Sequence, residues 1–160
     1  MSGTFIYVVR HAEAGDRKRW EGSDEARPLS AGGRRQAERL VELYANQPFF
    51  QLVSSPFVRC MQTLEPLAEA RGLSVEPLEQ LAEGRPWGYL EKLVLEAEGE
   101  GPTVVCVHGD VFRDLMDDLI ERGIARRLSQ SFRKGATWVL DVRDGAIVSA
   151  HHLPAPQLSK

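Results

Sequence analysis

Short apolar segments alternate with segments of helical periodicity over most of the chain. Residues 4–9, 51–54 and 103–107 predict buried strands because they are short, apolar and rich in β-branched side chains, and residues 73–78 are a weaker strand candidate. Strands that alternate with helices favour a parallel sheet. We therefore expect an α/β fold, a three-layer sandwich in which a mostly parallel central sheet carries helices on both faces.

The expected helices follow these strands. Ser30 is a good capping residue for an apolar pattern of helical spacing, although the Gly-Gly pair at 32–33 weakens its first turn. Ser55-Pro56 predicts the N-cap and first position of a second helix. Residues 89–98 and 111–120 predict two more.

The C-terminal part predicts a β-hairpin. Asp144-Gly145 is a strong turn signal between the apolar segments 137–142 and 146–149, which places an antiparallel hairpin at the edge of the sheet. At 160 residues, the chain suits one domain with a substantial core. We expect that domain to span residues 1–153, with a loose tail at 154–160.

The composition excludes some partners. A formal net charge of -3 argues against a general nucleic-acid binder or a protein of anionic membrane surfaces, because both partners demand a basic face. No apolar run approaches the roughly 20 residues of a membrane span, and the amino terminus lacks the pattern of a signal peptide. Cys60 and Cys106 lie in apolar periodic segments and predict reduced core residues. We expect a soluble, cytoplasmic protein.

Charged and polar side chains follow each buried strand. Arg10 and His11 leave the first strand, residues 54–55 and then Arg59 follow the second, and His108-Gly109 follows the strand over 103–107. Ligands in open α/β sheets bind beyond the carboxyl ends of the strands. These three distant stretches are therefore expected to converge on one edge of the sheet.

Two arginines and two histidines together suit the chemistry of a phosphoryl group. The planar forks of Arg10 and Arg59 match phosphate oxygens, and His108 and the helix amides near Gly109 can add donors. Histidine is largely neutral near pH 7 and becomes more so beside cations. We expect neutral His11 to attack phosphorus and form a phosphohistidine, which water then hydrolyses.

The leaving group of this reaction needs a proton. Glu83, in the loop after the predicted strand at 73–78, is the first candidate for the donor. Glu13, Asp16 and Glu79 remain alternatives.

Two other function classes stay open at the level of the residues. A binding module would use the same pocket to hold a phosphorylated protein or metabolite without hydrolysing it. A metal hydrolase would use nearby histidines and carboxylates, namely His11, Glu13, Asp16, His108 and Asp110. Their spacing matches no metal motif, and the chain carries neither a Walker loop nor a dinucleotide fingerprint.

Four sequence motifs together resemble one protein family. They are RHAEA at 10–14, RPLSAGGRRQA at 27–37, SSPFVRCMQT at 54–63 and VVCVHGDVFRDL at 104–115. They resemble, in order, the RHG or RHA, PLTxxGxxQA, SSPLxRxxQT and second-histidine motifs of the histidine phosphatase superfamily, also called phosphoglycerate-mutase-like. The resemblance spans most of the chain.

The resemblance implies specific roles. His11 would be the phosphorylated nucleophile, and Arg10, Arg59 and His108 would form the phosphate pocket, with no metal and no cofactor. Glu83 resembles the acid/base position of the family, although the residues after it, Gly84-Arg85-Pro86-Trp87-Gly88, differ from the usual G-W-E-G.

The resemblance also bears on the substrate. Ala12 after the histidine and the short length are similar to the small phosphohistidine phosphatase branch. The expected function is a metal-independent phosphatase for phosphomonoesters or protein phosphohistidine. Nucleotides and sugar phosphates are the alternative substrates, and the partner is a phosphorylated small molecule or a phosphoprotein.

Overall fold

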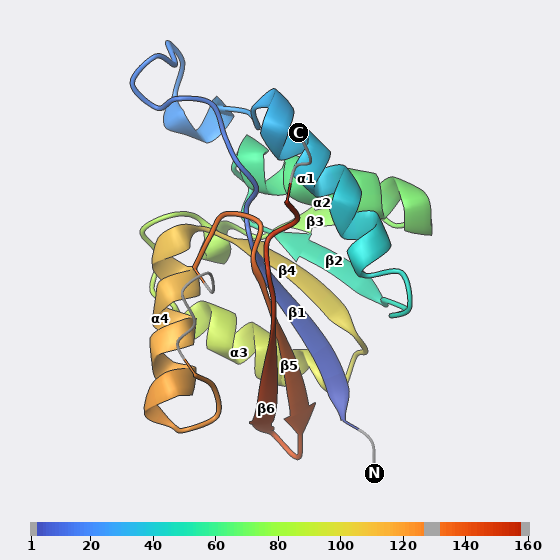
Figure 1. Ribbon diagram of the computed structural model, residues 1–160. Coiled ribbons are helices and arrows are strands. Elements are labelled where there is room, and N and C mark those ends of the chain that lie inside the picture. The colour runs from blue at the N-terminus through green and yellow to red at the C-terminus, as the bar shows by residue number, and fades with distance from the viewer. Residues whose placement is uncertain (1–2, 127–131, 158–160) are drawn as a thin grey trace.

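One mixed sheet forms the centre of the protein (Figure 1). The computed structural model describes residues 3–126 and 132–157. Within them the sheet has the order β3-β2-β4-β1-β5-β6. The strands are β1 (Thr4–Arg10), β2 (Gln51–Ser54), β3 (Val75–Pro77), β4 (Thr103–Val107), β5 (Thr137–Arg143) and β6 (Ala146–Leu153). The first four are parallel, β5 runs antiparallel to β1, and β6 runs antiparallel to β5. The predicted α/β class and edge hairpin are confirmed.

Helices cover both faces of this sheet (Figure 1). On one face lie α1 (Ala31–Leu43) and α2 (Val58–Arg71), and on the other lie α3 (Gly88–Ala97) and α4 (Gly109–Glu121). All five residues of β4 are buried, because successive side chains point to opposite faces of the sheet and helices cover both faces. Val104 and Cys106 belong to the core under α1 and α2, whereas Val105 and Val107 belong to the core under α3 and α4. The predicted three layers are confirmed.

The start of α2 corrects one expectation. The helix begins at Val58 with Phe57 as its N-cap, two residues after the predicted first position at Pro56. The Ser55 hydroxyl accepts a hydrogen bond from the Phe57 amide (3.2 Å) and pairs with Nε2 of His108 (2.8 Å). This long-range partner holds Ser55 at the end of the sheet, so the helix starts later than the local signal indicates.

The C-terminal hairpin turns where the sequence predicts it. Asp144 and Gly145 both have positive φ (51° and 76°), as a two-residue type I′ turn requires. β6 is longer than predicted, however, and pairs with β5 as far as Leu153. Beyond it, Arg39 of α1 donates a hydrogen bond to the carbonyl of Gln157 (2.6 Å). Residues 158–160 of the expected tail lie outside the described residues.

The cysteines and the helix lengths bear on two expectations drawn from the composition. Cys60 and Cys106 are buried free thiols. In the part of the chain that the structure describes, no helix combines the length and apolar character needed to cross a bilayer.

Gly33 allows α1 to pack against the chain that follows β1. The hydroxyl of Ser30 accepts a hydrogen bond from the Gly33 amide (3.0 Å), which confirms the predicted cap. A Cβ atom at Gly33 would lie 1.8 Å from the carbonyl oxygen of Glu13. The glycine that weakens the helix locally is therefore required by a close backbone contact.

We expect Gly33→Ala to lower the free energy of unfolding by about 3 kcal/mol or more, because backbone on both sides blocks relief of the clash. Gly88→Ala is the matched control. Gly88 also lies in the first turn of a helix, and its Cβ would meet nothing within 4 Å. Urea unfolding of both variants measures the difference, and equal stability of the two would contradict this account of Gly33.

Candidate active site

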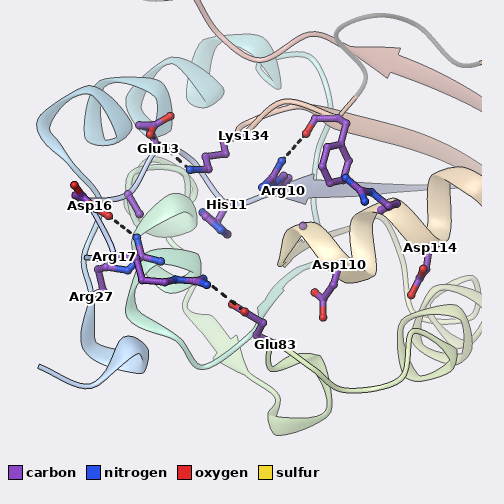
Figure 2. A pocket seen from close by; sticks show the side chains of 15 residues that line it. Arg10, His11, Glu13, Asp16, Arg17, Arg27, Glu83, Asp110, Asp114 and Lys134 are labelled. Carbon is purple, nitrogen blue, oxygen red and sulfur yellow. Dashed lines mark hydrogen bonds and ion pairs between the residues drawn. The ribbon is translucent and has the colours of Figure 1, made fainter. Parts of the chain in front are cut away.

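A cavity of about 830 Å³ opens at the carboxyl ends of β1 and β4 (Figure 2). Arg10 and His11 line it from the end of β1, Gly109 from the start of α4, and Glu83 from the loop before α3. These residues are far apart in the sequence. Their meeting at one edge follows from the parallel direction of the two strands.

Arg10 has a fixed side chain with an unused donor. One terminal nitrogen donates to the carbonyl of Phe132 (2.7 Å), and the guanidinium carbon lies 4.4 Å from the centre of the Phe132 ring. Its Nε is buried without a hydrogen-bond partner. A Cβ atom at Gly109 would lie 2.8 Å from the guanidinium group, so glycine gives Arg10 its room. Burial, followed by the charge of Arg113, lowers the pKa of Arg10.

His11 is a buried, neutral imidazole. Its Nδ1 lies 2.8 Å from the carbonyl of Ala12, and because a carbonyl only accepts, Nδ1 carries the proton and Nε2 keeps a lone pair. Burial lowers the pKa of His11 from 6.5 to about 3; the hydrogen bond to Ala12 opposes this shift and the charges of His108, Arg59 and Arg10 add to it. A neutral imidazole with a lone pair on Nε2 has the chemistry that a nucleophile at neutral pH needs.

The chain after His11 is held by two side chains from the predicted motifs. The amide of Ala12 donates to Oγ1 of Thr63 (3.0 Å), and the amide of Glu13 donates to Oε1 of Gln36 (2.9 Å). The Thr63 hydroxyl in turn donates to the carbonyl of Arg59 (2.7 Å). The polar residues of these motifs therefore position the backbone beside the site.

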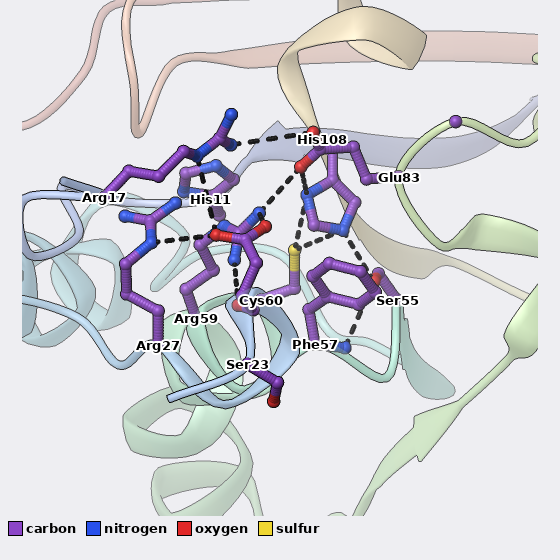
Figure 3. A network of polar contacts seen from close by, with 12 residues as sticks. His11, Arg17, Ser23, Arg27, Ser55, Phe57, Arg59, Cys60, Glu83 and His108 are labelled. Atoms are coloured by element: carbon purple, nitrogen blue, oxygen red, sulfur yellow. Dashed lines mark hydrogen bonds and ion pairs between the residues drawn. The ribbon is translucent and has the colours of Figure 1, made fainter. Parts of the chain in front are cut away.

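Arg59 is fully buried at the start of α2 and forms ion pairs with two carboxylates (Figure 3). One terminal nitrogen donates to the Asp24 carbonyl (2.8 Å), and the other lies 3.0 Å from Oδ2 of Asp24 and 2.7 Å from Oε1 of Glu83. Its Nε has no hydrogen-bond partner. Arg59 thus joins the two loops that contribute Asp24 and Glu83.

His108 lies beside His11, at the N-cap of α4. Its ring centre is 5.7 Å from that of His11, its Nε2 pairs with Ser55, and its Nδ1 lies 3.5 Å from Oε1 of Glu83. The His108 side chain is only 1% exposed. Neither His108 nor Arg59 is among the residues that line the cavity, whereas Glu83, which contacts both of them, does line it (Figure 3).

Asp24 is a site residue that the sequence did not reveal. It begins a short 3-10 helix (Asp24–Ala26) within the polar segment between β1 and α1, and its carboxylate contacts Arg27 (3.1 Å) and Arg17 (3.5 Å) as well as Arg59. Burial acts to raise the pKa of Asp24, but the hydrogen bond from Arg27 and the charge and hydrogen bond of Arg59 hold it below its usual value. Nothing in an aperiodic polar segment indicates such partners.

The candidates for the proton donor differ in position. Glu83 contacts both Arg59 and His108. Glu13 and Asp16 line the cavity but form ion pairs with Lys134 and Arg19, respectively. Glu79 is exposed and does not line the cavity.

The residues of the metal alternative have other partners. Besides the ion pairs of Glu13 and Asp16, Asp110 accepts hydrogen bonds from the amides of Gly84 and Val111. Across residues 3–126 and 132–157, no three histidine, cysteine or acidic side chains group in a way that could hold a metal ion.

The lowered pKa of His11 predicts that the free energy of unfolding depends on pH. Between pH 6.5 and 3 the unfolded chain binds a proton at this residue that the folded protein does not bind, so the free energy of unfolding falls as the pH is lowered through this window. Lowering the pH from 7.5 to 4.5 should cost wild type roughly 2–3 kcal/mol more than His11→Gln. Urea unfolding at both pH values measures this difference; an equal loss in the two proteins would mean that His11 titrates normally.

Comparisons with known proteins agree with this geometry. The model of the histidine phosphatase superfamily (branch 1) matches residues 6–93. The 8-oxo-(d)GTP phosphatase of Mycolicibacterium smegmatis is 39% identical over 155 residues, which cover 94% of this chain and 48% of that protein. The chain thus spans about half the length of the curated relative it matches.

Solved structures share the fold. The protein histidine phosphatase SixA in complex with tungstate superposes with a TM-score of 0.73 at 20% identity, over 93% of this chain and 94% of that one. A SixA-type protein from Agrobacterium tumefaciens gives 0.71 at 20% identity, over 88% and 93%. With the family match over more than half of its residues, the chain belongs to branch 1 of the histidine phosphatase superfamily.

Proposed function

We propose that this protein is a metal-independent phosphatase that hydrolyses phosphomonoesters or protein phosphohistidine through a covalent phospho-His11 intermediate. One observation carries the proposal. The neutral ring of His11 lies among cationic side chains, and two of these, Arg10 and Arg59, have a buried Nε donor without a partner. Such donors cost stability unless an acceptor meets them, and phosphate oxygens are suitable acceptors.

The reaction has two steps. Arg10 and the first amides of α4 at Gly109 hold the phosphoryl oxygens while Nε2 of His11 attacks phosphorus. The bond from phosphorus to the leaving oxygen breaks, and that oxygen takes a proton from Glu83. In the second step a water molecule gives a proton to the Glu83 carboxylate and attacks phosphorus, which releases phosphate and restores His11.

Binding and protonation are linked through Arg59. Without substrate, the Arg59 guanidinium is occupied by the carboxylates of Asp24 and Glu83. A phosphoryl dianion that takes up Arg59 donors displaces Glu83 toward the leaving group. As it leaves Arg59, the Glu83 carboxylate takes up from solvent the proton that it then donates to the leaving oxygen.

The relatives support more than one substrate. One is named an 8-oxo-(d)GTP phosphatase and the structural neighbours include SixA protein histidine phosphatases. The cavity of about 830 Å³ is within the range of about 300–1,000 Å³ of small-molecule sites. A nucleotide phosphatase is therefore the second candidate.

We expect wild type to hydrolyse p-nitrophenyl phosphate in the presence of EDTA and to form an acid-labile phosphoenzyme. His11→Ala should abolish both, because no other group replaces the nucleophile, whereas His151→Ala, at an exposed position on β6, should retain both. Full activity of His11→Ala would reject the mechanism. Activity lost in EDTA and restored by a divalent ion would favour a metal hydrolase, and phosphate binding without turnover would favour a binding module.

Glu83→Gln should show a dependence on the leaving group. Alkyl phosphates need a proton donor, so their kcat should fall about 10²- to 10⁴-fold. p-Nitrophenyl phosphate should be affected much less, because p-nitrophenolate departs without a proton. Glu79→Gln, at an exposed glutamate outside the cavity, is the control. An equal fall for both substrates in Glu83→Gln would remove Glu83 from the donor role.

A further inference from the structure

Two guanidinium groups share one aromatic ring at the wall of the cavity. The guanidinium carbons of Arg10 and Arg113 each lie 4.4 Å from the centre of the Phe132 ring. They are therefore no more than 8.8 Å apart, twice that distance. Arg113 lies on α4, one turn after Gly109, and lines the same cavity as His11.

The other cations of this cavity have carboxylate partners. Lys134 pairs with Glu13, and Arg17 and Arg27 pair with Asp24. For Arg10 and Arg113, no ion pair is present within residues 3–126 and 132–157.

Asp110 and Asp114, on the same helix, line this cavity too, but within the described residues neither forms an ion pair with Arg113. The Asp110 carboxylate accepts hydrogen bonds from two backbone amides, and Asp114 is exposed, so solvent screens its charge. Two cations this close repel each other: the charge of Arg113 acts to lower the pKa of Arg10, while the charges of Glu13 and Asp110 act to raise it. A doubly anionic ligand would relieve this repulsion.

We propose that the cavity accepts a small organic diphosphate, whose terminal phosphoryl group binds Arg10 and whose second phosphoryl group binds Arg113. This assignment rests on the proposed function and names its substrate class. Nε2 of His11 attacks the terminal phosphorus, the bond to the bridging oxygen breaks, and that oxygen leaves as part of a phosphomonoester. Water then hydrolyses the phosphohistidine. A phosphorylated protein side chain brings a single phosphoryl group and leaves Arg113 unused.

Arg113→Gln tests the assignment through the preference of the enzyme for a diphosphate over a monophosphate. The ratio of kcat/KM for ADP to that for AMP should fall about tenfold or more, as expected for loss of one charge-assisted contact. Arg113→Lys keeps the charge without the planar fork and should restore part of the ratio. Arg34→Gln is the control, because Arg34 is also exposed but lies on α1, outside this cavity.

A binding measurement separates this inference from the proposed function. Calorimetry of wild type should show tighter binding of methylenediphosphonate than of methylphosphonate, and Arg113→Gln should reduce that difference by a similar factor. This result without turnover of any phosphate compound would support the subsite and reject the phosphatase. Turnover with ratios unchanged in Arg113→Gln would overturn the subsite alone, and a higher kcat/KM for a phosphohistidine protein than for ADP would overturn the diphosphate assignment.

Discussion

The buried charge of Arg59 is the interaction on which the arrangement of the site depends. Moving a guanidinium group out of water costs several kcal/mol unless partners compensate it. Here the compensation comes from Asp24, in the segment between β1 and α1, and from Glu83, in the loop before α3. Both loops are thereby fixed at the start of α2. Both loops supply residues of the cavity wall, so the pairing of one buried cation helps to set the shape of the cavity.

A second constraint acts on the backbone next to His11. Hydrogen bonds to Thr63 and Gln36 hold the amides of residues 12 and 13. Gly33 lets α1 lie close enough to this backbone for the Gln36 side chain to reach the amide of residue 13. In the proposed mechanism these side chains take no part in bond making. They set the direction in which His11 leaves β1, so most residues of the motifs serve geometry and a few serve chemistry.

This division explains how much the sequence could predict. Strands, helices and the positions of Arg10 and His11 follow from local periodicity and from the direction of parallel strands, and the structure agrees apart from the start of α2 and the length of β6. Partners across long sequence separations do not follow. The local sequence predicts that Ser55 caps a helix. In the structure its hydroxyl pairs with His108, 53 residues away, and a partner at that separation leaves no local signal. Asp24 is equally hidden, since one carboxylate in a polar segment resembles any solvated charge.

The ion pair between Arg59 and Glu83 also bears on catalysis. Under the proposed function, a phosphoryl group competes with a carboxylate already bound to Arg59, which weakens binding of the ground state. In the proposed mechanism the displaced carboxyl group is the proton donor for the leaving oxygen, so part of the binding energy brings that donor into place. Interactions that contribute more in the transition state than in the bound substrate are those that accelerate a reaction. An anion held within the site before substrate arrives can therefore raise kcat even as it lowers affinity.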